Sequence, residues 1–388
     1  MSLAIELQHT FTSTFQETPH LIIKSPGRIN LIGEHTDYNE GFVMPAAIDK
    51  GVYIAISKRK DNQIHLHALD YDEHYSTTVD LLTFGDSLWT KYILGATRIV
   101  KERESLGGFN LAVAGDLPLG AGLSSSAALT CATTFALSTL FELALTQIDI
   151  ARIGQRTEHE AVGVRCGIMD QFASVFGKEN SFIRLDCRDL SFEYVGADLS
   201  DYEILLLNTN VKHSLASSAY NKRRESCERA VALVKEKYEE VHSLRDISLV
   251  QLDELVKHVD PEAYQKAKFV VQENQRLFAA VEALQHNNLP SLGELLYQTH
   301  WALSKEYEVS CEELDYLVAE VSRIPAVLGA RMMGGGFGGC TINIVKKDKS
   351  HEVFEQLKDD YFKKFNLELT PISVAISEGT HIVKDFTT

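Results

Sequence analysis

The residues best suited to chemistry lie in one short run, positions 27–38, which reads Gly-Arg-Ile-Asn-Leu-Ile-Gly-Glu-His-Thr-Asp-Tyr. Arg28 places a cation at one end of an apolar alternation, and Glu34, His35 and Asp37 follow at the other end. Sugar hydroxyls favour such side chains because each hydroxyl can both donate and accept a hydrogen bond. The run is therefore typical of a site that holds a polyhydroxylated ligand beside a negatively charged group.

A second segment, Gly120–Ser126, combines two glycines with three consecutive serines where a helix is expected to begin. Glycine allows the backbone to approach an anion closely, and a helix N-terminus offers free N–H donors and a positive dipole end. The segment thus predicts a phosphate-binding loop. A serine-capped helix after an ordinary tight turn is the alternative that these residues leave open.

A third glycine cluster, at positions 334–339, formally matches the dinucleotide pattern GxGxxG. That pattern needs a helix after the glycines, whereas a strand, Thr341–Val345, is expected here. We therefore reject a nicotinamide site. A Walker A loop is excluded because Gly177-Lys178 is followed by Glu179, and a GxSxG hydrolase motif is excluded because Ser126 replaces its last glycine.

Composition limits the class of protein. The chain has 388 residues, enough for two domains, with 45% apolar and 24% charged residues. A net charge of −16 argues against nucleic-acid partners, which require clustered Lys and Arg. The six cysteines are scattered and the first twenty residues do not resemble a signal peptide, so we expect reduced thiols in a cytoplasm. The uncharged stretch 117–141 is long enough to span a bilayer, but its glycines, prolines and hydroxyl residues favour a buried helix.

Periodicity predicts a mixed α+β chain without repeats. Strands are expected at 21–24, 28–32, 51–57, 63–68 and 109–114, and helices at 89–104 and 148–162, with a long helix after the serine loop. Beyond residue 190 we expect helices at 221–240, 261–284 and 352–365 and strands at 341–345 and 372–376. Ser310 is expected to begin a capping box ahead of a further helix.

The three glycine-containing segments, in this order, resemble the three motifs of the GHMP small-molecule kinases, a superfamily that includes homoserine, mevalonate and phosphomevalonate kinases. The first run resembles the galactokinase signature within it, and the resemblance covers essentially the whole chain. It implies two domains: a mixed sheet covered by helices, like a domain of a small-subunit ribosomal protein, and a ferredoxin-like α/β sandwich. The active site is expected in the cleft between them. We place the domains at 1–190 and 191–369, with 370–388 able to return to the first.

The resemblance also implies an activity. Members of this family transfer phosphate from ATP to the anomeric hydroxyl of α-D-galactose, giving α-D-galactose 1-phosphate and ADP, the first committed step of galactose catabolism by the Leloir pathway. A cytoplasmic monomer that uses Mg²⁺ and binds neither nucleic acid nor membrane is expected. Two alternatives are a kinase for a related sugar, such as N-acetylgalactosamine or arabinose, and a non-catalytic sensor of galactose and ATP.

Specific residues acquire roles from the resemblance. It implies that Asp170, within Gly167–Phe172, and Arg28 are catalytic. Galactose is expected to contact Glu34, His35, Thr36, Asp37 and Tyr220. ATP is expected to contact Trp89, Tyr92 and the loop residues Gly120, Ala121, Gly122, Leu123, Ser124, Ser125 and Ser126. Mg²⁺ is expected to bind Ser126 and Glu158, a hydroxyl and a carboxylate that suit a hard cation.

Each assignment has a plainer alternative. Asp170 could cap a helix, Arg28 could form a surface ion pair, and Glu158 could be a solvated carboxylate like Glu160. The spacing of Trp89 and Tyr92 also suits ordinary core aromatics. The third motif departs from the family pattern, because Met333 stands where threonine is common, so Met333 is given no role.

Overall fold

The computed structural model describes residues 2–118, 120–211 and 216–387 of the chain. Its largest sheet has six strands in the order β13-β1-β3-β6-β4-β5. All neighbours are antiparallel except β4 and β6, which are parallel. The strands are β1 (Leu21–Asn30), β3 (Pro45–Lys58), β4 (Gln63–Ala68), β5 (Glu73–Thr78), β6 (Phe109–Gly115) and β13 (His381–Asp385).

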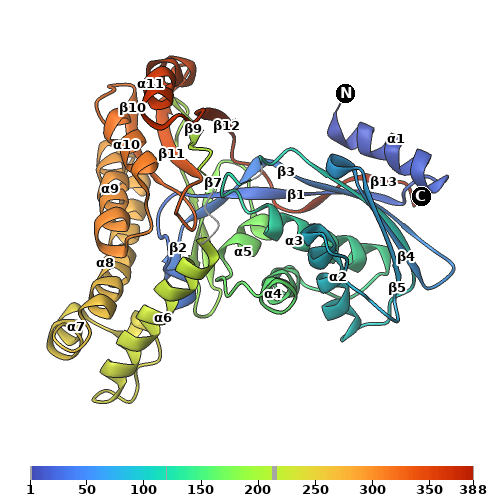
Figure 1. Ribbon diagram of the computed structural model, residues 1–388, viewed down its shortest axis with the longest axis horizontal. Helices are drawn as coiled ribbons and strands as arrows, with labels where there is room; N and C mark the ends of the chain where they lie inside the picture. The colour runs from blue at the N-terminus through green and yellow to red at the C-terminus, as the bar shows by residue number, and fades with distance from the viewer. Residues whose placement is uncertain (1, 119, 212–215, 388) are drawn as a thin grey trace.

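The two faces of this sheet are covered differently (Figure 1). Helix α1 (Leu3–Phe15) packs on one face, where small alanines of β3 and β6 leave room for its apolar stripe. On the other face lie α2 (Leu88–Lys101), α3 (Ser125–Leu140), α4 (Gln147–Thr157) and α5 (Met169–Phe176). Side chains alternate between the faces along each strand, so one sheet can supply two packed layers.

Helix α3 accounts for the long uncharged stretch of the sequence. It contacts β1 and β3 as well as α2, α4 and α5, and most of its side chains are buried. A helix buried on nearly all sides needs apolar residues all round. Among the described residues, no helix has the length and apolar content needed to cross a membrane.

The second main sheet is fully antiparallel, in the order β10-β11-β9-β12. Its strands are β9 (Tyr202–Asn208), β10 (Val327–Met332), β11 (Cys340–Lys346) and β12 (Thr370–Val374). Residues of β9 alternate: Leu205 and Leu207 pack with α10 (Glu312–Val321) and α11 (Ser350–Phe365), whereas Leu206 belongs to the large core that includes α9 (Leu289–Ala302). This arrangement is the expected α/β sandwich.

The remaining elements surround these two sheets. Helices α6 (Ala216–Lys235), α7 (Leu249–Leu255) and α8 (Pro261–Gln285) share a separate apolar cluster. A small sheet in the order β2-β7-β8 contains Phe42–Val43, Ser181–Asp186 and Phe192–Gly196. Short helical turns cover Asp37–Asn39 (η1), Leu69–Tyr71 (η2), Glu158–Val162 (η3), Leu244–Asp246 (η4) and Leu303–Tyr307 (η5).

Three sequence expectations differ from the structure. The strands expected at 21–24 and 28–32 form one strand, β1, because a register shift between Pro26 and Arg28 absorbs the proline. Of the stretch 370–388, which is expected to be able to return to the first domain, β13 does pair with β1, whereas its first part, β12, pairs with β9. The capping box at Ser310 is wrong, because α10 begins one residue further on with Cys311 as its N-cap and no side-chain cap. The domain limits at 190 and 369 stay a prediction.

Candidate active site

A cavity of about 250 Å³ lies where the end of β1 meets α5, the start of α6 and the third glycine cluster. Its lining brings together residues from four distant parts of the sequence. They include Arg28, Glu34, His35, Asp37, Glu158, Gly167, Asp170, Tyr220 and Gly334–Gly336. The first run, the Asp170 segment and the third glycine cluster therefore share one site, as the sequence predicts.

Arg28 and Asp170 form the centre of this site. Arg28 is 4% exposed, and its guanidinium donates to both carboxylate oxygens of Asp170, from Nε at 2.7 Å and from Nη2 at 2.9 Å. Its remaining nitrogen, Nη1, donates to the carbonyl of Gly122 at 2.6 Å. Bidentate pairs of this kind are among the stronger hydrogen-bonded ion pairs. Arg28 is thus no surface ion pair, and Asp170 does not cap α5, whose N-cap is Ile168.

The serine loop packs directly against β1. The backbone N–H of Arg28 donates to the carbonyl of Leu123 at 3.2 Å. A Cβ added at Gly27 would lie 2.6 Å from that same carbonyl oxygen, so this close approach requires glycine. The loop that carries the serines and the run that carries Arg28 therefore meet, although almost a hundred residues separate them.

The N-terminus of α3 is arranged for an anion. Ser124 precedes the helix in the left-handed conformation, with φ of 61°, and its side chain does not cap the helix. Its hydroxyl instead donates to Asp170. The first amide groups of α3 are therefore without a serine cap, which leaves donors and the positive dipole end for a ligand. This geometry favours the phosphate-loop interpretation over the serine-capped helix.

A second cavity, of about 520 Å³, is lined in part by the start of this helix. Ser125 and Ser126 line it together with Trp89 and Tyr92 of α2. The indole Nε1 of Trp89 donates to Glu73 at 2.6 Å, which fixes the ring at the cavity wall. Val52, Val113, Leu117 and Leu129 supply apolar surface. A flat heterocycle with a phosphate tail directed at α3 fits this combination.

Glu158 lies between the two cavities at the end of α4. It is 6% exposed, lines the first cavity and accepts a hydrogen bond from Gln171 at 3.0 Å. Burial and the charge of Asp170 raise the pKa of Glu158 to about 7, although the nearby Ser126 hydroxyl lowers it in part. Glu158 is therefore not a solvated carboxylate. Glu160 fits that description, because it is exposed and paired with Arg156.

The hydroxyl of Ser126 and the carboxylate of Glu158, with the carboxylate of Asp170 nearby, form a set of oxygen ligands that suits Mg²⁺. Two carboxylates in one site, the buried Glu158 and the partly exposed Asp170, repel each other, and a cation between them would remove that cost. The residues present at Ser126 and Glu158 therefore fit the expected ion.

The predicted sugar-binding residues occupy the first cavity with one exception. Burial lowers the pKa of His35 to about 3, so the ring stays neutral near pH 7. Its Nδ1 lies 2.7 Å from the Tyr38 hydroxyl, and its ring packs 5.3 Å from the ring of Tyr220. Thr36 is the exception, because its buried hydroxyl donates to the carbonyls of Gly33 and Phe42 and it does not line the cavity.

Asp37 lines the first cavity and has a strongly raised pKa. Burial and the charge of Asp170 raise the pKa of Asp37 to about 7. The carboxylate lies against the backbone of Gly167, where a Cβ would come within 1.8 Å of Oδ2. An acid held in this way is half protonated near neutral pH, and such groups concentrate at functional sites.

Strand β10, directly before the third glycine cluster, holds a residue that the sequence did not single out. Arg331 is fully buried on β10 and donates to the backbone carbonyls of Asn30 and Leu31 at the end of β1. It also pairs with Glu34 at 3.1 Å, and Glu34 accepts from the Gly334 N–H at 2.7 Å. Arg331 therefore joins the second sheet to the first and positions Glu34. Met333, where threonine is common, is buried in the main core.

Comparison with known proteins agrees with this geometry. Residues 9–58 match the galactokinase galactose-binding signature, residues 91–178 the GHMP kinase N-terminal domain and residues 280–364 the GHMP kinase C-terminal domain. A galactokinase of Thermotoga neapolitana is 40% identical over 360 residues, covering 92% of this chain and 98% of the relative. The chain belongs to the galactokinase family of GHMP kinases. It is a sugar kinase by family, and its two-domain α+β fold is the one that the sequence predicts.

Other galactokinases extend this likeness. A galactokinase of Actinobacillus succinogenes is 38% identical over 380 residues, covering 96% of this chain and 97% of the relative. The crystal structure of Lactococcus lactis galactokinase complexed with galactose superposes with a TM-score of 0.93 at 34% identity, over 98% of this chain and 100% of that one. Methanococcus jannaschii mevalonate kinase, at 19% identity and a TM-score of 0.66, shares the fold.

Proposed function

We propose that this protein transfers the γ-phosphoryl group of ATP to the anomeric oxygen of α-D-galactose, as expected of a galactokinase. Galactose would occupy the first cavity and ATP the second, with its phosphates at the N-terminus of α3. The observation that carries the proposal is the position of Arg28, which contacts the phosphate loop at Gly122 and the cavity carboxylate Asp170 at once.

Phosphoryl transfer mainly requires positioning and charge neutralisation, because its transition state is loose. In the proposed step, a bond forms between the anomeric oxygen and the γ-phosphorus while the bond from that phosphorus to the leaving oxygen of ADP breaks. The hydroxyl proton passes to the Asp170 carboxylate or to solvent. The Arg28 guanidinium supplies positive charge beside the phosphate loop, and the amide groups at the start of α3 hold the phosphates.

Mg²⁺ would be held by Ser126 and Glu158. There it would neutralise phosphate charge and orient the nucleotide. Glu34, His35, Asp37 and Tyr220 would bind the sugar. Their neutral and charged groups provide both acceptors and donors within one cavity, which a molecule with several hydroxyl groups requires.

Phosphate transfer from labelled ATP, measured across a panel of sugars, tests this function. Galactose should give the highest kcat/KM, with N-acetylgalactosamine, arabinose and glucose at least about tenfold lower, a difference of about 1.4 kcal/mol. A higher kcat/KM for another sugar would identify a kinase for that sugar. Calorimetric binding of galactose without turnover would identify the non-catalytic sensor instead.

A further inference from the structure

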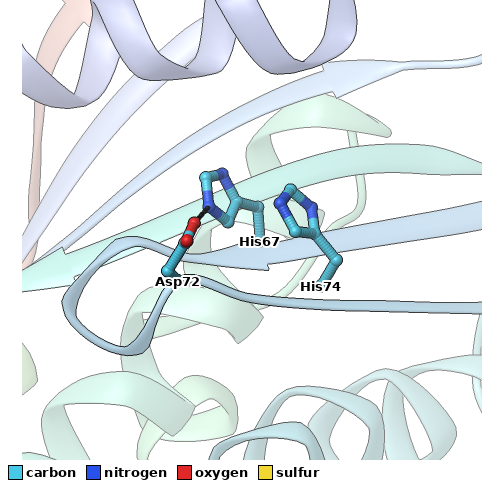
Figure 2. A group of neighbouring side chains, drawn as sticks. All are labelled: His67, Asp72 and His74. Atoms are coloured by element: carbon cyan, nitrogen blue, oxygen red, sulfur yellow. Dashed lines mark ion pairs between the residues drawn. The ribbon is translucent and has the colours of Figure 1, made fainter.

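A second cluster of chemically active side chains lies outside both cavities, on the hairpin formed by β4 and β5. His67 and His74 face each other across the hairpin as register partners, and Asp72 lies in the turn between the strands. Figure 2 shows the two imidazole rings side by side, with the Asp72 carboxylate directed at His67. The three side chains offer ligand atoms that all lie within 4.8 Å of one another.

The arrangement within the cluster leaves one polar atom without a protein partner. His67 is 5% exposed, and its buried Nε2 has no hydrogen-bond partner. The Asp72 oxygen is 3.7 Å from that nitrogen, which is too long for a hydrogen bond. A buried nitrogen without a hydrogen-bond partner destabilises the folded state. A bound cation would satisfy it.

The surroundings of His67 match those of a metal ligand. Its other ring nitrogen, Nδ1, lies 3.2 Å from the hydroxyl of Thr14 on α1. Histidines that bind metals through one nitrogen usually donate a hydrogen bond from the other, which fixes the tautomer and the ring plane. Here such a bond would leave a free lone pair on Nε2, the nitrogen that faces Asp72.

The other two groups are open to solvent. The side chain of Asp72 is 94% exposed and His74 is also exposed, so an ion could enter and keep water molecules. The rings of His67 and His74 are stacked, parallel within 11° with centroids 4.0 Å apart, and the exposed His74 would have to rotate before both rings face one ion. Two imidazoles and one carboxylate select zinc and similar divalent transition metals over Mg²⁺.

We propose that His67, Asp72 and His74 bind one divalent transition-metal ion, with Zn²⁺ as the representative cation. This site is independent of the proposed catalysis. The turn that contains Asp72 also contributes Asp70, Tyr71 and Glu73 to the lining of the second cavity. A bound ion would therefore restrain the hairpin that forms one wall of that cavity.

Calorimetric titration of the full chain, free of any polyhistidine tag, tests the site. Zn²⁺ is added in the presence of excess Mg²⁺, which occupies sites made of oxygen ligands. One Zn²⁺ should bind, and H74A and D72N should each weaken that binding by at least about tenfold. H351A is the matched control, because His351 is an exposed histidine on α11, and it should bind Zn²⁺ like the parent.

Equal affinity in the parent, H74A and D72N would overturn the site, as would absence of binding in the parent. Anomalous diffraction from a crystal soaked in Zn²⁺ gives a second readout that does not depend on substitution. The strongest peak is expected between His67 and His74. A strongest peak at other residues would contradict the proposal.

Discussion

The Asp170 carboxylate is bound at both oxygens by the Arg28 guanidinium, which reaches it from β1, a strand 142 positions earlier in the chain. The same guanidinium contacts the phosphate loop at Gly122. One cation therefore connects the place where a phosphate would bind to a carboxylate that lines the first cavity, the proposed sugar site. Arg28 and Asp170 therefore act as one ion pair at the centre of the site.

Replacing Asp170 with asparagine should separate catalysis from binding. Asparagine keeps the size of the side chain but removes the negative charge of the carboxylate, whose two oxygens accept hydrogen bonds from Arg28. We expect kcat to fall by at least about 100-fold. Galactose binding, measured by calorimetry, should stay within about tenfold of the parent, or about 1.4 kcal/mol. Equal losses in turnover and in binding would instead give Asp170 a structural role.

Replacing Glu158 with glutamine should weaken the use of Mg²⁺. Removal of one charge from the expected metal site should raise the Mg²⁺ concentration needed for half-maximal activity by about tenfold, while the KM for galactose changes little. E160Q is the matched control, because Glu160 lies two residues away and is paired with Arg156 at the surface. Mg²⁺ dependence that is the same in E158Q and E160Q would exclude Glu158 as a ligand.

The raised pKa of Asp37 predicts that galactose binding depends on pH. If the ionised carboxylate accepts sugar hydroxyls, a pKa of about 7 means that affinity falls as the pH drops below 7. Affinity at pH 6 should be about tenfold lower than at pH 8. Calorimetry between these pH values should show this change in the parent and not in D37N. A flat profile in the parent would contradict the assignment.

The same residue predicts an effect on stability with a definite sign. The pKa of Asp37 is higher in the folded protein than in the unfolded chain, so the folded state holds its proton more tightly. Its contribution to stability is therefore lost as the pH rises from about 4 to about 7. D37N should unfold with a free energy at least about 1 kcal/mol higher than the parent at pH 8, and the difference should shrink toward pH 5. Denaturant melts at both pH values measure this.

Gly167 is predicted to control the position of Asp37. A methyl group there would overlap the Asp37 carboxylate, so G167A should displace it and raise the KM for galactose by at least about tenfold. G196A is the matched control, because a Cβ at Gly196 meets nothing within 4 Å, and its KM should equal that of the parent. Equal KM values for both variants would show that Asp37 does not contact the sugar.

The sequence could predict the parts of the site that depend on local patterns. Arg28, Asp37 and the serine loop lie in short segments whose residue types already indicate sugar and phosphate chemistry. Helices such as α8 were predictable for the same reason, since a proline and an apolar stripe mark their course. What distinguishes Asp170 and Glu158 from ordinary acids was the family resemblance, because no local pattern separates a buried carboxylate from an exposed one.

Features that depend on distant contacts could not be predicted. Arg331 donates hydrogen bonds to backbone carbonyls about 300 positions earlier. No sequence pattern around residue 331 indicates these distant partners. Strand β13 is short and mostly exposed at the sheet edge, so it lacks the apolar alternation that reveals a strand. Thr36 shows the opposite error: it is expected to bind the sugar, but its hydroxyl contacts two backbone carbonyls instead.

The most direct measurement is a crystal structure with galactose and a non-hydrolysable ATP analogue bound together. The anomeric oxygen should lie beside Asp170 and face the terminal phosphate, with that phosphate near Arg28 and the start of α3. Galactose and nucleotide bound in separate, distant cavities, with Arg28 and Asp170 touching neither, would contradict the assignment of this chain as a galactose kinase.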